Sequence, residues 1–366
     1  MKTRIVYIVD NLKTGGAQTQ LSRLVEGLSG KDFEISVICL GDSNPKLVDQ
    51  IGKSRVTFFP MKCIWTIGFW MNFNRMVRLL KKLKPDVVHA YLNTSNVFGA
   101  WAAKKTNVPY IVTSRRDMGH FRSGRIAAME KWSNRFCHKV VCVSTAVKDK
   151  TIKEEHLPEE KAVVLYGGVD TELFKKQPSE DNAAPLTVGM VATMDRPMKG
   201  HFDFLKAAKI LADRGKKVRF VLVGDGGLRP GLEEFVRTAK IEKVVQFKGP
   251  SNNVQQELGE MDIFVLPSHS EGFSNAVLEA MSMEVPVLAN ALEGNLEIID
   301  DRSSGMLVDP RDVRQMADRI AEYVDRRSEL KLMGQKARKK ILENFTIGHM
   351  VNRYETFYRQ LVAVKG

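Results

Sequence analysis

The sequence predicts two consecutive α/β domains, each built on a doubly wound parallel sheet. Short runs of β-branched residues alternate with longer stretches of helical period, which is typical of repeated βα units. A polar stretch at 175–185 interrupts this alternation, which then starts again. The length of 366 residues also favours two domains, because a domain averages roughly 150 residues.

The expected elements follow this alternation along the chain. In the first half we expect strands at 4–9, 34–40, 56–59, 87–90, 110–113 and 139–143, and helices at 18–29, 70–84, 95–106 and 125–137. In the second half we expect strands at 186–190, 219–223, 244–247, 263–266 and 285–289, and helices at 202–213, 232–239, 273–282, 313–326 and 350–361.

These elements group into domains with defined limits. We expect an N-terminal Rossmann-like domain at 1–170, a linker at 171–185, a second Rossmann-like domain at 186–345, and a C-terminal helix at 346–366 that crosses back to the first domain. Doubly wound sheets bind ligands at the carboxyl ends of their strands. We therefore expect the functional site in a cleft that the two domains face.

The composition excludes several protein classes. Hydrophobic residues make up 43% of the chain and charged residues 27%, which excludes a collagen-like or wholly disordered protein. No run approaches the roughly 18 consecutive apolar residues of a membrane-spanning helix. The apolar run 5–9 has no cleavage site behind it, so we expect a first strand rather than a signal peptide. The four cysteines contain no C-x-x-C pair, and they indicate a cytoplasmic protein.

The positive charge is concentrated in the first half of the chain. The whole chain has a net charge of +13. Residues 1–170 contain 27 basic and 15 acidic side chains and account for +12, which leaves +1 for 171–366. This imbalance indicates an anionic partner for the first half: nucleic acid, an anionic membrane surface or a phosphorylated substrate.

A glycine pair follows the first expected strand. Gly15 and Gly16 allow a ligand to approach the backbone closely, and the start of the next helix favours an anion. The segment lacks the spacing of a dinucleotide-binding fingerprint and of a P-loop. A purely structural turn therefore remains an equal alternative. The same holds for the glycine-rich turn at 223–227.

The segment 266–281 contains the densest functional signal. Glu271 lies in a loop after an expected strand, and Glu279 lies eight positions later in an expected helix. Ser274 and Asn275 are natural N-cap residues, so free amides gather where a phosphate could bind. Glu279 could accept two ribose hydroxyls. The alternative is a capped helix with two solvated glutamates, which fits poorly with the apolar residues that follow Glu279.

This segment resembles the E-x7-E motif of the retaining GT-B glycosyltransferases of family four. Further segments resemble other motifs of that family and occur in the same order: Gly15-Gly16-Ala17, Pro85-Asp86-Val87-Val88-His89, Val141-Cys142-Val143-Ser144, Tyr166-Gly167-Gly168-Val169-Asp170, Lys199-Gly200 and Gly294-Asn295-Leu296-Glu297. The resemblance thus extends over the whole chain.

The resemblance implies a two-domain GT-B enzyme with a retaining mechanism. Such an enzyme transfers a hexosyl or N-acetylhexosaminyl group from a nucleotide sugar, here expected to be a UDP-sugar. Its acceptor, a glycan or lipid-linked molecule of polysaccharide or lipopolysaccharide biosynthesis, binds to the N-terminal domain. The family needs no metal or other cofactor, and this sequence has no D-x-D motif. A GT-B sugar-nucleotide epimerase or phosphorylase stays open as an alternative. A nucleic-acid-binding protein ranks far below, because no nucleic-acid motif is present.

The resemblance also implies roles for individual residues. Lys199 would neutralise the leaving diphosphate, together with Arg196, which would replace an arginine that the family has at the position of Thr193. Glu271 would bind sugar hydroxyls and Glu279 the ribose. The implied donor site comprises Gly15, Gly16, Arg196, Lys199, Glu271, Gly272, Phe273, Ser274, Asn275 and Glu279, and the implied catalytic residues are Glu271, Lys199 and Arg115.

The acceptor site is expected around three residues after the strand 110–113. Arg115 stands where the family often has a histidine, and Arg116 and His120 follow closely. Either Arg115 or His120 could take the place of the family histidine. For His120, a solvated loop position is an equal alternative.

The stretch 63–84 combines aromatic and basic residues. Trp65 and Phe69 precede the expected helix, and Arg75 and Arg78 lie within it. Aromatic residues beside a basic face are typical of a helix that lies on anionic lipid. Core packing is an equal alternative, because part of the stretch has helical spacing. The hypothesis is a cytoplasmic protein that associates peripherally with the inner face of the plasma membrane through these four residues.

Overall fold

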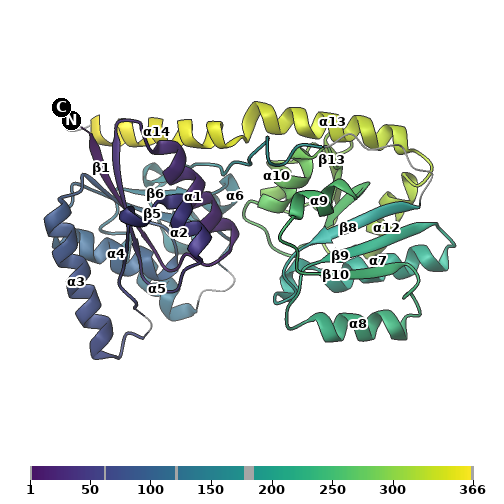
Figure 1. Cartoon of the computed structure of the whole chain (residues 1–366), viewed down its shortest axis with the longest axis horizontal. Coiled ribbons are helices and arrows are strands. Elements are labelled where there is room, and N and C mark those ends of the chain that lie inside the picture. The colour runs from purple at the N-terminus through teal and green to yellow at the C-terminus, as the bar shows by residue number, and fades with distance from the viewer. Residues whose placement is uncertain (1, 62, 120–122, 177–184, 364–366) are drawn as a thin grey trace. The chain divides into compact units, whose positions relative to one another are not determined.

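The computed structural model describes residues 2–61, 63–119, 123–176 and 185–363. His120 and residues 177–184 of the expected linker lie outside the described residues. The chain divides into two compact units (Figure 1). The first comprises Met1–Gly168 and Ile347–Gly366, and the second comprises Val169–Thr346.

The described part of the first unit contains a seven-stranded parallel sheet in the order β3-β2-β1-β4-β5-β6-β7. The strands are β1 (Thr3–Val9), β2 (Phe33–Cys39), β3 (Val56–Phe58), β4 (Val87–Ala90), β5 (Tyr110–Arg115), β6 (Lys139–Cys142) and β7 (Ala162–Val164). The chain moves outward from β1 to β3 and then returns to place β4 on the other side of β1. This reversal creates a topological switch point between β1 and β4.

Helices connect these strands, and a C-terminal helix joins them. They are α1 (Gly16–Leu28), α2 (Pro45–Ile51), α3 (Ile67–Leu83), α4 (Asn93–Lys105), α5 (Gly124–Ser133), α6 (Thr145–Glu155) and α14 (Ile347–Ala363), with 3-10 turns at η1 (Lys53–Arg55) and η2 (Glu159–Lys161). The helix α14 packs on α1, where a Cβ at Gly27 would lie 2.4 Å from Cγ2 of Val351. The absence of a side chain at Gly27 therefore permits this close packing.

The second unit repeats the architecture with a six-stranded parallel sheet in its described part, in the order β10-β9-β8-β11-β12-β13. The strands are β8 (Leu186–Val191), β9 (Val218–Val223), β10 (Val245–Gly249), β11 (Ile263–Leu266), β12 (Val287–Asn290) and β13 (Gly305–Val308). The helices are α7 (His201–Asp213), α8 (Arg229–Thr238), α9 (Val254–Gly259), α10 (Asn275–Ser282), α11 (Glu293–Leu296), α12 (Val313–Glu322) and α13 (Arg327–Asn344), with a 3-10 turn at η3 (Pro197–Lys199). The switch point of this sheet lies between β8 and β11.

The prediction of two doubly wound α/β sheets is confirmed, with differences in single elements. The structure adds short strands at β7 and β13 and helices at α2, α6, α9, α11 and α13, of which α13 is the longest. The helix α13 has a low hydrophobic content and buries only a narrow stripe of side chains, so its sequence shows little helical periodicity. The helix α3 begins at Ile67, earlier than predicted, because Thr66 accepts a hydrogen bond from the Phe69 amide and caps it. Among the described residues, no helix is long and apolar enough to cross a membrane.

A buried hydrogen-bond network ties α14 to the first sheet. The Tyr358 hydroxyl lies 2.7 Å from the Tyr7 hydroxyl and 2.6 Å from Nδ1 of His89, whose Nε2 lies 2.8 Å from the Ser114 hydroxyl. All four side chains are almost completely inaccessible. Burial, reinforced by the charge of Arg116, lowers the pKa of His89 to about 3. The network therefore holds a neutral imidazole in the core.

The depressed pKa of His89 predicts that acid destabilises the first unit. The unfolded chain binds the proton below about pH 6.5 and the folded chain only near pH 3, so stability is lost as the pH falls through this window. The expected loss is about 1.4 kcal/mol per pH unit. It can be measured from urea-dependent hydrogen exchange of the β4 and β5 amides, corrected for the intrinsic pH dependence of exchange.

The variant His89→Gln should flatten this dependence on pH. The surface variant His156→Asn is the matched control, since asparagine tolerates the left-handed backbone at this position. An equal pH dependence in wild type and His89→Gln would contradict the prediction.

Candidate functional site

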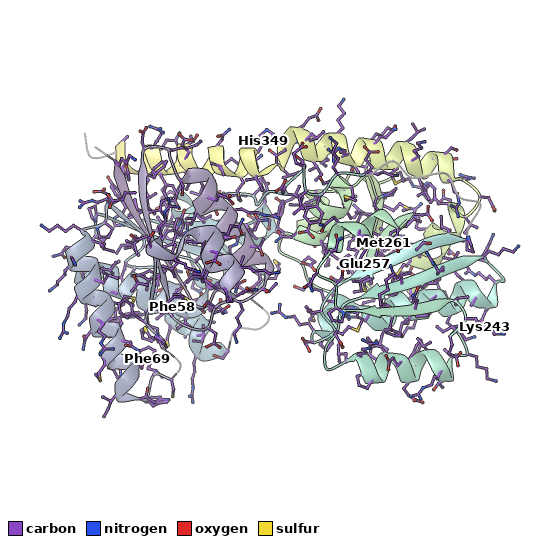
Figure 2. The ribbon with its side chains drawn as sticks, viewed as in Figure 1. Phe58, Phe69, Lys243, Glu257, Met261 and His349 are labelled. Carbon is purple, nitrogen blue, oxygen red and sulfur yellow. The ribbon has the colours of Figure 1, made fainter. Side chains whose placement is uncertain are left out.

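The carboxyl ends of β8 and β11 meet at the switch point of the second sheet. The two strands are parallel neighbours, with Ile263 paired with Val188. A Cβ at Gly189 on β8 would lie 2.1 Å from the sulfur of Met261, so the glycine leaves room for this side chain. Met261 is labelled in Figure 2. Because the strands are parallel, the loops that follow them leave from the same edge of the sheet. This edge is where doubly wound sheets bind their ligands.

The two loops are held together by backbone contacts. Gly200 has a φ of +78°, and a Cβ there would lie 2.0 Å from the carbonyl oxygen of Pro267. The His269 amide donates a hydrogen bond of 2.7 Å to the carbonyl of Met198. A side chain at position 200 would be excluded both by the backbone conformation and by the space. The glycine therefore fixes the segment before α7 against the loop after β11.

Lys199 and Glu271 form an ion pair at this junction. The Lys199 ammonium lies 2.5 Å from Oε1 of Glu271, which also accepts a 2.8 Å hydrogen bond from the Ser268 hydroxyl. The side chain of Lys199 is 27% exposed and that of Glu271 is 9% exposed. An ammonium has three N–H donors, and no further acceptor among the described residues engages that of Lys199. The pair thus retains donors for an anionic ligand.

Residues of β12 and of the turn after it contact the loop that carries Glu271 and hold it in place. The Asn290 side chain donates a 2.8 Å hydrogen bond to the Ser268 carbonyl, and Asn295 donates one of 2.8 Å to the Asn290 carbonyl. A Cβ at Gly294 would lie 2.4 Å from the carbonyl oxygen of Gly272. The G-x-x-E segment therefore serves as a platform for the loop that carries Glu271.

A histidine–carboxylate pair also links the two loops. Nε2 of His269 lies 2.8 Å from Oδ2 of Asp203, in the first turn of α7. The sequence interpretation gave no role to either residue, because 66 positions separate them. In the sequence, a role for His269 is indicated only by its position in the segment that carries the E-x7-E motif. Its partner could be found only from the fold.

The glycine-rich turn after β9 braces the loop after β8. Gly224 has a φ of +137°, and a Cβ there would lie 2.0 Å from the Ala192 carbonyl oxygen. The Gly227 amide donates a 2.8 Å hydrogen bond to Asp195. The sequence left a ligand-binding turn and a purely structural turn as equal alternatives here, and these contacts support the structural role. Arg196 is exposed on the same loop, directly before η3.

The helix α10 begins where the sequence predicts it. Ser274 is the N-cap residue, but its side chain makes no capping hydrogen bond, in contrast to the natural N-cap role expected for it. Asn275 and Glu279 are half-buried and lie one turn apart, on the same side of the helix. Phe273 is buried and its ring packs against Phe345 at 5.6 Å. Phe273 therefore anchors the loop, while Asn275 and Glu279 remain accessible.

His201 occupies the buried position directly after Gly200. Its side chain is 2% exposed. Burial lowers the pKa of His201, and the charge of Lys199 lowers it further. A neutral imidazole next to Lys199 adds no positive charge to this edge of the sheet.

Gly15 and Gly16 belong to the first unit. Gly15 is the N-cap residue of α1, with an extended backbone, and Gly16 is the first residue of the helix. A Cβ at Gly15 would lie 2.6 Å from Oε1 of Gln18. The two glycines follow β1, at the carboxyl edge of the first sheet and next to its switch point.

The expectation of a catalytic or acceptor-binding role for Arg115 requires correction. Its side chain is 3% exposed, and its guanidinium donates two hydrogen bonds to Glu155 at 2.8 and 2.7 Å and one to Asn134 at 3.0 Å. A buried cation with these partners stabilises the packing of α6 on the sheet and presents no donor to a ligand. The sequence interpretation could not foresee this, because Glu155 is 40 residues away.

Arg116 differs from Arg115 in its surroundings. It follows β5 at the carboxyl edge of the sheet, is half-buried, and lies over the ring of Tyr91 at 5.1 Å. Its Nε is buried without a hydrogen-bond partner among the described residues. Arg116 is therefore the cation of this pair that a ligand can engage.

The prediction that Phe69 contacts a membrane is wrong. Phe69, which is labelled in Figure 2, lies on α3. Its side chain is 3% exposed, and its ring packs against that of Phe98 at 4.8 Å. The helix begins two residues before Phe69 and turns its ring toward α4. The exposed apolar side chains at this end of the helix are instead Trp65 (84%), Ile67 (81%), Met71 (51%) and Trp70 (38%). Arg75 and Arg78 are exposed, as a surface role requires.

In the part of the chain that the structure describes, no three His, Cys, Asp or Glu side chains gather as metal ligands would. The groups that meet at the second switch point are instead a cation, a carboxylate and the start of a helix. Such a set can bind a phosphorylated sugar through charge and hydrogen bonds.

Comparisons with known proteins match both units. Residues 14–173 match the family model described as Glycosyltransferase Family 4, and residues 170–340 match the model described as Glycosyl transferases group 1. The chain is 28% identical over 384 residues to the UDP-Gal:alpha-D-GlcNAc-diphosphoundecaprenol alpha-1,3-galactosyltransferase of Escherichia coli, with 100% of this chain and 98% of the relative covered.

Two further similarities extend over most of the chain. The N,N'-diacetylbacillosaminyl-diphospho-undecaprenol alpha-1,3-N-acetylgalactosaminyltransferase of Campylobacter jejuni is 24% identical, with 81% of this chain and 84% of the relative covered. The crystal structure of Anabaena HepE in complex with UDP and glucose has a TM-score of 0.86 at 20% identity, with 98% of this chain and 99% of that chain covered. With two adjoining family matches and a shared two-unit fold, the chain belongs to the GT-B glycosyltransferases of group 1 and family 4.

Proposed function

We propose that this glycosyltransferase transfers a hexosyl or N-acetylhexosaminyl group from a UDP-sugar to a lipid-linked acceptor in polysaccharide or lipopolysaccharide biosynthesis. The observation that carries the proposal is the Lys199–Glu271 pair at the switch point of the second sheet. It combines a cation for a diphosphate with a carboxylate for sugar hydroxyls. The names of the E. coli and C. jejuni relatives support a diphosphoundecaprenol-linked acceptor.

The positive charge of Lys199 is suited to stabilising the diphosphate as it leaves the sugar. When the bond between the sugar and the diphosphate breaks, negative charge grows on the diphosphate oxygen. The ammonium of Lys199 would stabilise that charge, with Arg196 from the same exposed loop and the backbone amides at the start of α10. These groups supply positive charge without a divalent cation. We therefore propose a reaction that does not depend on a metal.

The carboxylates have separate roles in this proposal. Glu271 exchanges its ion pair with Lys199 for sugar hydroxyls once the diphosphate takes over the ammonium. Glu279 accepts hydrogen bonds from the ribose, one helical turn below the N-terminus of α10. The acceptor oxygen attacks the anomeric carbon from the face of the departing diphosphate, which takes up the acceptor proton. Attack from that face retains the configuration of the sugar.

The first unit supplies the acceptor and membrane surfaces in this proposal. Arg116 offers a partly buried guanidinium at the carboxyl edge of the sheet, suited to an acceptor phosphate. The exposed apolar side chains at the start of α3, with Arg75 and Arg78 along the helix, would contact an anionic membrane surface. A lipid-linked acceptor would then reach the enzyme without leaving the membrane.

The central experiment measures UDP release from a panel of UDP-sugars. Release that requires a diphosphoundecaprenol-linked sugar, together with a lengthened glycan, supports the transferase. Release or rearrangement of the donor sugar without an acceptor would instead identify a phosphorylase or an epimerase.

The variant Glu279→Ala should weaken UDP binding, because a hydrogen bond to a charged group contributes about 1.5–3 kcal/mol, or roughly a 10- to 150-fold change in affinity. Calorimetry of the folded variant measures this loss. The exposed variant Glu242→Ala removes the same charge elsewhere in the unit and should bind UDP as wild type does. Unchanged UDP affinity in Glu279→Ala would refute the ribose assignment.

The variant Lys199→Ala should lower kcat by at least about 100-fold, because a donor aimed at transition-state charge contributes roughly 2.7–4 kcal/mol. Arg196→Ala should have a smaller effect in the same direction, and the exposed Lys217→Ala should have none. Steady-state kinetics with and without EDTA tests both the charge assignment and the metal independence. A rate that EDTA abolishes and Mn²⁺ restores would overturn the metal-free mechanism.

Replacing Trp65 and Ile67 by serine should reduce binding to phosphatidylglycerol liposomes, because both side chains are more than four-fifths exposed in the structure. Affinity for UDP should not change. The matched control replaces Leu332 and Leu342, exposed leucines of the second unit, by serine. Co-sedimentation at low and high salt measures the effect. If wild-type protein does not bind such liposomes at low salt, a soluble acceptor becomes the better proposal.

A further inference from the structure

A cavity of about 600 Å³ lies in the first unit, and none of the residues proposed above to bind the donor, the acceptor or the membrane lines it. It forms where β5 and β6 begin and where η2 leads into β7. Arg115 and Arg116 lie at the opposite end of β5. A strand rises about 3.3 Å per residue, so the length of β5 separates the cavity from the carboxyl edge of the sheet. The cavity is therefore distinct from the expected acceptor site.

The cavity is lined by four cations and one carboxylate. The cations are Lys104 in the last turn of α4, Arg135 after α5, Lys139 at the start of β6 and Lys161 in η2, and the carboxylate is that of Glu160. Each cation comes from a different segment of the chain. The fold therefore collects positive charge here that the sequence distributes over 58 residues.

These cations are not neutralised by acidic side chains within the described part of the chain. Lys139 donates to the Glu160 carbonyl at 2.6 Å, Lys161 to the Asn134 carbonyl at 3.3 Å, and Arg135 to the Trp132 carbonyl at 2.9 Å. Each of these three side chains is thus held in place by a neutral acceptor and keeps further N–H donors. Like charges gathered in a concave site produce a positive potential that attracts anions.

His138 lies in the cavity lining, where the nearby positive charges act on its imidazole. Its Nδ1 accepts a 3.0 Å hydrogen bond from the Ile111 amide, which assigns the proton of the neutral ring to Nε2. Burial lowers the pKa of His138, and the charges of Lys161 and Lys104 lower it further. The two lysines therefore lie close enough to act on a group in the cavity wall.

We propose that this cavity binds a small soluble molecule that carries a diphosphate group. Its volume is in the range of small-molecule sites, and its concave form favours a small molecule over a flat membrane surface. The excess of cations matches the multiple charge of a diphosphate better than the single charge of a carboxylate. Val108, Pro109 and Phe136 provide an apolar part of the wall for the organic portion of the ligand.

The test uses inorganic pyrophosphate as the probe and His138 as a site-specific reporter. Imidazole resonances of histidine-labelled protein are titrated with pH at constant ionic strength, and that of His138 is identified by its loss in His138→Gln. Bound pyrophosphate should offset the nearby lysine charges and raise the pKa of His138. This readout is specific to the cavity, because Lys199 and Arg196, the residues proposed to bind the diphosphate of the UDP-sugar, belong to the other unit.

A double variant and a matched control locate the effect. Lys104→Gln/Lys161→Gln should raise the pKa of His138 in the free protein and abolish its further rise with pyrophosphate. Lys131→Gln/Lys153→Gln removes the same charge from exposed positions outside the cavity lining and should behave as wild type does. A His138 pKa that millimolar pyrophosphate leaves unchanged in wild type, or that rises equally in the double variant, would overturn the proposal.

Discussion

The contact between Gly200 and the Pro267 carbonyl is the constraint on which the candidate site of the second unit depends. A Cβ at this position would overlap the carbonyl oxygen, and the positive φ of Gly200 also disfavours any other residue. The contact places the loop after β8 directly on the loop after β11. Lys199, the residue before the glycine, is thereby brought to Glu271. A conformational requirement of one glycine thus positions two charged groups that are 72 residues apart.

The rest of the second unit stabilises this arrangement from several directions. The turn after β9 holds Asp195, the end of β12 holds the Ser268 carbonyl, and Asp203 holds His269. Each contact comes from a different strand end or helix start of the parallel sheet. A site built in this way is preorganised, because its charged groups do not need to be ordered when the ligand binds.

The first unit uses its buried polar groups mainly for packing. The Arg115 guanidinium donates hydrogen bonds to Glu155, and the His89 ring is hydrogen-bonded to the Tyr358 hydroxyl on the C-terminal helix. His89 occurs in a segment that resembles a family motif, and Arg115 stands where the family often has a histidine. Burial distinguishes both residues from Arg116, which a ligand can engage. The unit also places cations at both ends of its sheet. Because these cations lie at two separate places, the net charge of the N-terminal half alone could not identify a single anionic partner.

The sequence by itself determined the fold class, the family and the position of the Glu271–Glu279 segment, because these depend on local periodicity and on short motifs. It could not decide whether Arg115 or Phe69 is accessible, since burial depends on partners such as Glu155 and Phe98 that are distant in the chain. It also could not reveal the pairs Lys199–Glu271 and His269–Asp203 or the basic cavity around His138. Only the tertiary structure decided these features, because parallel sheets bring together the ends of strands that the sequence separates by a helix or more.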